Sequence, residues 1–121
     1  MKNIKLEIYK RLYKYSIDIV KFTSSLPKNS ICYVIGNQLL RSGTSVTANL
    51  IEAKAASSKK DYINFYSHSL KSANESKFWL AIIRDTQPTE KNGSILLLKE
   101  TIEIANIIAA SILTMKNKRK I

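Results

Sequence analysis

Glycine and proline are scarce in this chain. Among 121 residues there are 3 Gly and 2 Pro. A β protein of this length needs many tight corners, and those corners are built largely from Gly and Pro. The scarcity disfavours such a fold and favours a few long helices joined by short connections. We expect the whole chain, residues 1–121, to form one domain, because domains commonly contain about 100–150 residues.

Apolar residues recur at three- and four-residue spacing in four segments, which predicts four amphipathic helices. The first two cover about residues 4–25 and 30–56. The third runs from a short polar break at 57–61 to about residue 85, and the fourth covers about 94–117. Short connections between helices of this length imply antiparallel neighbours. The predicted fold is therefore all-α, an up-and-down antiparallel four-helix bundle.

The breaks between the segments carry recognisable signals. Pro27 is expected to end the first helix, and Ser30 to cap the second. Ser58 and Asp61 resemble a capping box at the start of the third. The stretch from residue 87 to residue 94 is the clearest predicted loop.

Two glycines, Gly36 and Gly43, fall inside the second segment and lie on nearly the same side of a helix. Each costs about 1 kcal/mol of helix propensity relative to Ala. We favour the interpretation that another helix approaches closely there, over simple tolerance of glycine in a packed helix.

The fourth segment is apolar on more than one face. One row of apolar residues at helical spacing begins at Ile95, and an adjacent row begins at Leu97. Ile107 and Ala110 extend the apolar surface further around the helix. A monomeric bundle would leave part of this surface exposed to water. The pattern therefore predicts self-association.

The formal net charge is +11, from 20 Lys and Arg against 9 Asp and Glu. One interpretation is a polyanionic partner, because each neutralised phosphate releases a counterion. The other is a solvated, lysine-rich surface with no such role. The tail at 116–121 is basic, and we expect it to fray. The candidate nucleic-acid contacts are Lys10, Arg11, Lys14, Lys59, Lys60, Lys116, Lys118, Arg119 and Lys120.

Three tyrosines, Tyr9, Tyr13 and Tyr15, interleave with the first of these basic residues. Their rings could stack on bases. Tyr9 and Tyr13 also lie on the predicted core row of the first helix, and we favour that explanation for them.

The second segment carries a polar stripe on one side. Its members fall within an arc of roughly 80° and are Gln38, Arg41, Ser45, Asn49 and Glu52. These groups suit a directed hydrogen-bond network, and Glu75 in the third segment is a suitable partner for Arg41. A solvated polar face and a ligand-binding site are the alternatives. We expect the stripe to be structural and buried at a contact between helices or subunits.

At this stripe the sequence resembles a known family. The stretch from Gln38 to Ala53 is similar to the pattern Q-x-x-R-A-A-x-S-[IV]-x-x-N-[IL]-x-E-G of the 23S rRNA-intervening-sequence proteins. Residues 59–65, and 72–75 followed by Trp79, resemble the family's third helix. Ala53 and Lys71 depart from the pattern, each standing where Gly is usual.

The resemblance implies a four-helix bundle that assembles into a ring-like homopentamer in bacteria. A relative of the family, the accessory variability protein of diversity-generating retroelements, is a basic pentamer that binds nucleic acid. The resemblance thus implies a fold more strongly than a function.

Enzymatic chemistry finds no support in the residues. His68 is the only histidine, and Phe65 occupies the position three before it, so a Glu-x-x-His metal pair is absent. No Gly-rich phosphate loop is present, and Glu52 and Glu75 are better explained by pairing with Arg41 than as a catalytic pair. The lone cysteine, Cys32, is expected to be a core thiol. We predict no enzymatic activity, metal or cofactor.

The lone cysteine, together with the absence of a secretory h-region or a spanning apolar stretch, predicts a soluble cytosolic protein. The favoured function is that of a homo-oligomeric nucleic-acid-binding accessory protein, with RNA as the favoured ligand. The alternative is a homo-oligomeric protein-interaction scaffold with no nucleic-acid role.

Overall fold

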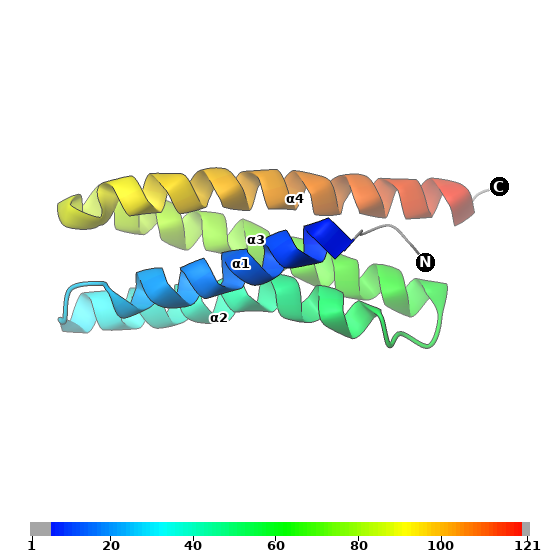
Figure 1. Ribbon diagram of the computed structural model, residues 1–121, viewed down its shortest axis with the longest axis horizontal. Helices are drawn as coiled ribbons and strands as arrows, with labels where there is room; N and C mark the ends of the chain where they lie inside the picture. Colours follow the sequence, from blue (N-terminus) through cyan, green and yellow to red (C-terminus); the bar gives the residue numbers. More distant parts are fainter. Residues whose placement is uncertain (1–5, 120–121) are drawn as a thin grey trace.

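The computed structural model describes the backbone of residues 6–119 and the side chains of residues 6–117. The chain forms α1 (Leu6–Ser24), α2 (Ser30–Ala53), α3 (Lys59–Thr86) and α4 (Lys91–Arg119), with a short 3-10 helix η1 (Pro88–Glu90) before α4. Successive helices run in opposite directions (Figure 1). Residues 6–119 contain no strand. The predicted all-α, up-and-down four-helix bundle is confirmed.

Helix ends follow local chemistry, with some shifts from the prediction. The cap of α2 is Asn29 rather than Ser30, because the Asn29 side chain accepts the backbone N–H of Cys32 at 2.9 Å. Ser58 caps α3 as predicted, accepting the N–H of Asp61 at 3.1 Å. The return bond of a true capping box is absent, since the Asp61 carboxylate accepts the N–H of Ser57 instead. The second helix also ends at Ala53, three residues before the predicted end at 56.

The predicted loop at 87–94 is largely wrong. Its second half forms the first turn of α4, where the Ser94 hydroxyl donates to the Glu90 carbonyl at 2.8 Å. Gly93 lies directly beneath Phe22 of α1, so close that a Cβ on it would stand 2.9 Å from Phe22 Cε1. The turn preference of Asn, Gly and Ser is overridden by this packing.

The core contains side chains from all four helices. The largest fully buried ones include Leu12 and Ile19 of α1, Leu39 and Leu50 of α2, Leu80 and Ile83 of α3, and Ile104 and Met115 of α4. Cys32 is buried, as predicted. Of the two apolar rows on α1, the fold buries the one that contains Leu12 and Ile19. Leu6, Tyr13 and Val20 in the other row are 68%, 65% and 42% exposed, so the expectation that Tyr13 lies in the core is wrong. Tyr9, in the same row, is half-buried and packs against the core as expected.

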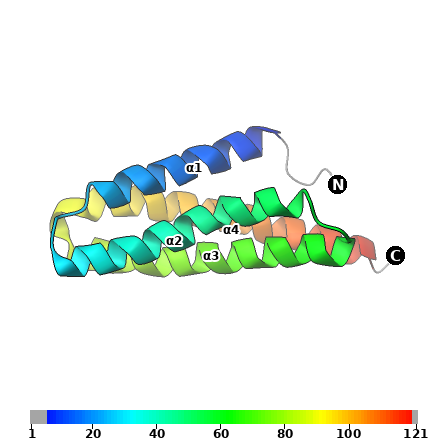
Figure 2. The same ribbon diagram turned by 90° about the horizontal axis from the view of Figure 1, so that it is seen from below.

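Gly43 lies where α1 approaches α2 closely, as predicted, whereas Gly36 lies beneath Leu26 of the connection that follows α1. A Cβ on Gly43 would stand 2.9 Å from Ile19 Cγ2, and a Cβ on Gly36 would stand 3.0 Å from Leu26 Cδ1. The contact between α2 and α3 includes buried hydrogen bonds from small residues. The Ser42 and Ser76 hydroxyls are 2.9 Å apart, and Ser69 donates to the Val46 carbonyl at 2.6 Å. Figure 2 shows α1 leaning away from the other helices toward its N-terminal end.

Candidate functional surfaces

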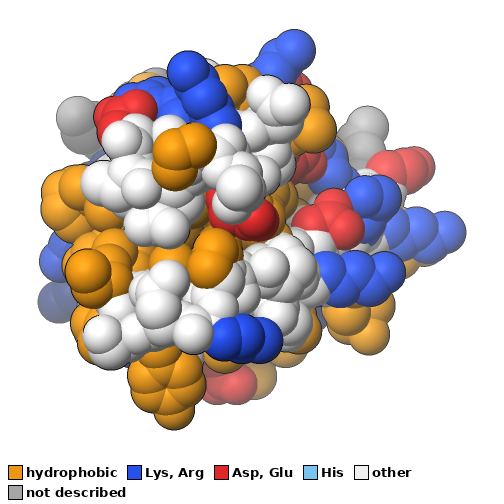
Figure 3. Space-filling view, turned by 90° about the vertical axis from the view of Figure 1, so that its left-hand side faces the viewer, with side chains coloured by type: hydrophobic (Ala, Val, Ile, Leu, Met, Phe, Trp, Pro, Cys, Tyr) orange, Lys and Arg blue, Asp and Glu red, His pale blue; other side chains and the backbone are white. Residues whose placement is uncertain are grey.

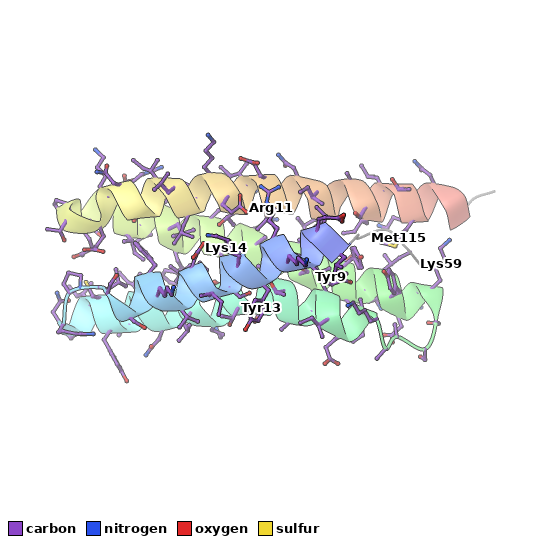
Figure 4. All side chains as sticks on the ribbon, viewed as in Figure 1. Tyr9, Arg11, Tyr13, Lys14, Lys59 and Met115 are labelled. Atoms are coloured by element: carbon purple, nitrogen blue, oxygen red, sulfur yellow. The ribbon has the colours of Figure 1, made fainter. Side chains whose placement is uncertain are left out.

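One end of the bundle brings together the start of α1, the end of α2, the start of α3 and the end of α4 (Figure 1). Exposed lysines at this end include Lys54, Lys60 and Lys116, and Lys59 is half-buried there (Figure 4). Two of the candidate contacts at the start of α3 and one at the end of α4 therefore lie at the same end. The side chains of Lys118, Arg119 and Lys120 lie outside the described residues.

The three basic candidates on α1 differ in how free they are. Lys10 is exposed. The Lys14 ammonium donates to the Asp18 carboxylate at 2.7 Å, and this bond raises the pKa of Lys14. Both are available to solvent. Arg11 is engaged with α4.

The Arg11 guanidinium is held by two carboxylates of α4. Its Nε and Nη2 donate to the two oxygens of Glu100, each at 2.7 Å, and Nη2 also donates to Glu103 at 2.9 Å. The hydrogen bonds to Glu100 raise the pKa of Arg11 further above its usual range. Its side chain is 34% exposed. The structure thus places Arg11 in the seam between α1 and α4, on the α4 side of α1 (Figure 4).

The three tyrosines of α1 occupy different environments. Tyr15 is buried with its hydroxyl 2.6 Å from Thr101 Oγ1, and burial raises its pKa to about 12. Its ring is therefore unavailable for stacking on bases. Tyr9 is half-buried beneath the Lys54 ammonium, which lies 3.8 Å from the ring centroid. Tyr13 is exposed on the α2 side of α1 (Figure 4).

Part of the polar stripe forms a network between α2 and α3. Arg41 pairs with Glu75, and its Nη2 also donates to Gln38 Oε1 at 2.9 Å. The Trp79 indole N–H donates to the Glu75 carboxylate at 3.0 Å. The bond from Trp79, and after it the bond from Arg41, lowers the pKa of Glu75. Trp79 was not included in the predicted network, although its position four residues after Glu75 puts the two on one helix face.

The remaining stripe residues do not join this network. The Ser45 hydroxyl donates to the Arg41 carbonyl at 2.7 Å, and the Asn49 amide donates to the Ser45 carbonyl at 2.9 Å. These bonds stay within α2, and Glu52 is exposed. The Arg41 and Glu75 side chains are 56% and 37% exposed. Within one chain the stripe therefore lies at the surface, and its burial at a subunit contact stays a prediction.

The opposite end of the bundle is apolar over the first turn of α2. Ile31, Tyr33 and Val34 are all more than half exposed. Beside them lies a pocket of about 410 Å³, lined by residues that include Pro27 and Cys32. Figure 3 shows hydrophobic side chains gathered on this end. The sequence pattern did not predict this surface, because it indicates that the first turn of α2 is helical but not which of its apolar side chains stay exposed.

His68 is exposed on α3. The described part of the chain holds no group of His, Cys, Asp and Glu side chains that could bind a metal ion. None of its helices is both long and apolar enough to cross a lipid bilayer.

The chain matches the family model of the 23S rRNA-intervening sequence proteins over residues 4–110. No curated protein matches it significantly. Among solved structures, it resembles a crystal structure from Bacteroides thetaiotaomicron, described as a protein of unknown function from the S23 ribosomal protein family. That similarity has a TM-score of 0.77 and 31% identity, and covers 86% of this chain and 96% of the other. The chain belongs to the 23S rRNA-intervening sequence protein family.

Proposed function

We propose that this chain is a non-enzymatic, basic accessory protein that self-associates and binds nucleic acid, with RNA as the favoured ligand. The observation that supports this most is the gathering of basic residues at one end of the bundle. Lys54, Lys59, Lys60 and Lys116 lie there, and the sequence continues from it into Lys118, Arg119 and Lys120. A concentration of positive charge of this kind attracts phosphates without reading sequence.

Not every basic residue contributes equally to this proposal. Arg11 already has two carboxylate partners, so its role is to hold α1 against α4. Lys10 and Lys14 are exposed, and they could extend the basic surface along α1. The binding surface that we propose is therefore centred on the start of α3 and the end of α4.

Self-association would increase the affinity of this surface. Because each copy carries the same basic end, an oligomer with parallel bundles would place several such ends side by side and bind one nucleic acid at several points. The family resemblance favours a homopentamer. Light scattering at micromolar concentration should show an oligomer, and a monomer would remove this part of the proposal.

The nucleic-acid proposal is tested by titration against RNA, single-stranded DNA and duplex DNA at two salt concentrations. The test variant replaces Lys116, Lys118, Arg119 and Lys120 with Ser. The matched control replaces Lys21, Lys28, Lys91 and Lys99, four lysines nearer the opposite end, with Ser. The test variant should bind all sequences more weakly, and its salt slope should flatten by about 0.7 per lost single-strand phosphate contact.

Unchanged binding of the test variant at low salt would show that the tail only solubilises the protein. An equal loss in both variants would show that net charge, rather than its placement, drives binding.

A second function is favoured by the apolar end around Tyr33. Exposed large apolar residues beside a pocket suit a contact with another protein. In that case the chain would be an oligomeric scaffold, and its positive charge would only steer association. This alternative would be favoured if the parent protein assembles but shows no salt-dependent binding to nucleic acid.

A further inference from the structure

The ring of Tyr9 lies at the basic end of the bundle, where α1 passes the end of α2. It is half-buried and packs against the core. Burial, and after it the nearby Tyr62 of α3, raises the pKa of Tyr9. Figure 4 shows Tyr9 at the same end as Lys59. The ring is therefore held in place beside the first turns of α3, the helix that begins with Lys59 and Lys60.

An exposed lysine covers one face of this ring. The Lys54 ammonium lies 3.8 Å from the centroid of the Tyr9 ring, which is a cation–π contact. Lys54 follows Ala53, the last residue of α2, and its side chain is exposed. Within residues 6–117 no carboxylate pairs with Lys54. Because an unpaired ammonium stays in water, the ring face beneath it lies at the surface, behind one long and flexible side chain.

This ring and this cation are the two groups that bind an unpaired nucleotide. A base stacks on an aromatic ring, and its phosphate pairs with an ammonium. Lys54 occupies the position of the base, and its four-carbon stem is flexible enough for the ammonium to move to a phosphate. In a duplex both faces of a base are covered by its neighbours, so the ring selects an unpaired base.

The other tyrosines near the basic residues lack this combination of a fixed ring and an accessible face. Tyr15 is buried. Tyr62 and Tyr66 are also buried, and their rings stack on each other with centroids 5.0 Å apart. Tyr13 is 65% exposed, so its ring is less constrained and would lose more freedom when a base stacks on it. Tyr9 is therefore the tyrosine best placed to hold a base.

We propose that Tyr9 is the platform on which the basic end stacks an unpaired base of a single-stranded nucleic acid, while Lys54 moves from the ring to a neighbouring phosphate. This inference rests on the nucleic-acid binding proposed above, and it adds the class of ligand: a single strand or a loop rather than a duplex. The surrounding lysines attract phosphates whether or not bases are present, whereas Tyr9 requires a base. These two contributions can be measured separately.

The test compares a short labelled single-stranded RNA with a strand of the same length and charge whose nucleotides lack bases. Fluorescence anisotropy measures the Kd of each, and the parent should bind the RNA more tightly. Tyr9→Leu removes the ring and should weaken binding of the RNA by about 5- to 140-fold, the range for one stacked base, but leave binding of the abasic strand unchanged. Tyr9→Phe keeps the ring and should behave like the parent. Tyr13→Leu is the matched control on the same helix and should bind both strands like the parent.

A second variant tests the lysine without changing the core. Lys54→Ala should weaken binding of both strands and flatten the salt slope by about 0.7, while the preference for the strand with bases remains. A measurement on the parent protein covers the case in which Tyr9→Leu does not fold, which circular dichroism checks. Ultraviolet cross-linking to RNA that contains 5-iodouridine should attach the RNA to Tyr9, and attachment to other residues alone would overturn the proposal.

The outcomes separate this inference from the proposed function. A parent protein that binds neither strand would overturn nucleic-acid binding as a whole. Equal binding of the two strands by the parent would leave phosphate binding standing and show that no base is stacked. A preference for bases that survives in Tyr9→Leu would place the stacking elsewhere. If Lys54→Ala lowers the melting temperature but leaves both affinities unchanged, Lys54 only joins α2 to α1, and its role at the phosphate is wrong.

Discussion

Replacing Gly43 with alanine would add a methyl group where α1 and α2 approach closely. The new Cβ would lie 2.9, 3.1 and 3.1 Å from Cγ2, Cδ1 and Cγ1 of Ile19. Ile19 is fully buried and branched at Cβ, so it has little freedom to move away. Overpacking of a core costs about 1–3 kcal/mol, whereas Ala for Gly in a helix gains about 1 kcal/mol. We therefore expect Gly43→Ala to lower the free energy of unfolding by up to about 2 kcal/mol.

The sign of this effect depends on Ile19. In an Ile19→Ala background the three clashing carbons are gone, so Gly43→Ala should then stabilise the protein by about 1 kcal/mol. Gly36→Ala is the matched control, because its Cβ meets only the flexible end of Leu26, at 3.0 Å. It should be neutral or slightly stabilising. Urea unfolding followed by circular dichroism measures all four variants, at one protein concentration because assembly shifts apparent stability.

Two results would refute this reasoning. If Gly43→Ala stabilises the protein equally with and without the Ile19 side chain, then Ile19 does not crowd the glycine. If Gly36→Ala and Gly43→Ala destabilise by the same amount, the cost arises from something other than the branched neighbour.

Three further predictions concern ionisable groups. Because the bond from Trp79 lowers the pKa of Glu75, its stabilising effect is present above the ordinary value of 4.5 and is lost as pH falls through the lower value in the folded state. In the Glu75→Gln variant the free energy of unfolding should therefore fall less steeply at acid pH than in the parent. The difference should be under about 1 kcal/mol, because the Glu75 side chain is partly exposed. The pKa of Tyr15 rises from 10.0 to about 12, so the free energy of unfolding should fall as pH rises between these values, by up to about 3 kcal/mol, and Tyr15→Phe should lack that loss. Arg11→Ala should raise hydrogen exchange in α1 selectively, whereas Lys14→Ala, which breaks an exposed pair, should not.

Much of the fold could be predicted from spacing and punctuation. Pro27 follows the end of α1 and Ser58 caps α3, as predicted, and Gly43 marks a close approach of α1 to α2. The boundary of α4 could not be predicted, because residues 91–94 favour a turn on their own and become helical through contact with Phe22. Local preference is weak enough for a single tertiary contact to decide between the two.

The surfaces were harder to predict than the core. The first helix has two apolar rows, and sequence alone did not show that the row with Leu12 would be buried while Tyr13 stayed exposed. The pairing of Arg41 with Glu75 could be predicted from chemistry, because a guanidinium and a carboxylate suit each other. Arg11, by contrast, looked like a free cation, because its carboxylate partners are far away in the sequence.

That separation in sequence has a consequence for how the chain is made. The contacts of α1 with α4 join residues 86, 89 and 92 positions apart, at Tyr15 and Arg11. At a synthesis rate of about 5–20 residues per second, α1 leaves the ribosome roughly 5–20 seconds before the helix that completes its seam. During that interval α1 can pair with α2, through the close approach at Gly43. The first helix to be synthesised is thus the last to be fully enclosed, and the α1–α2 hairpin shelters its apolar side while the rest of the chain is still being made.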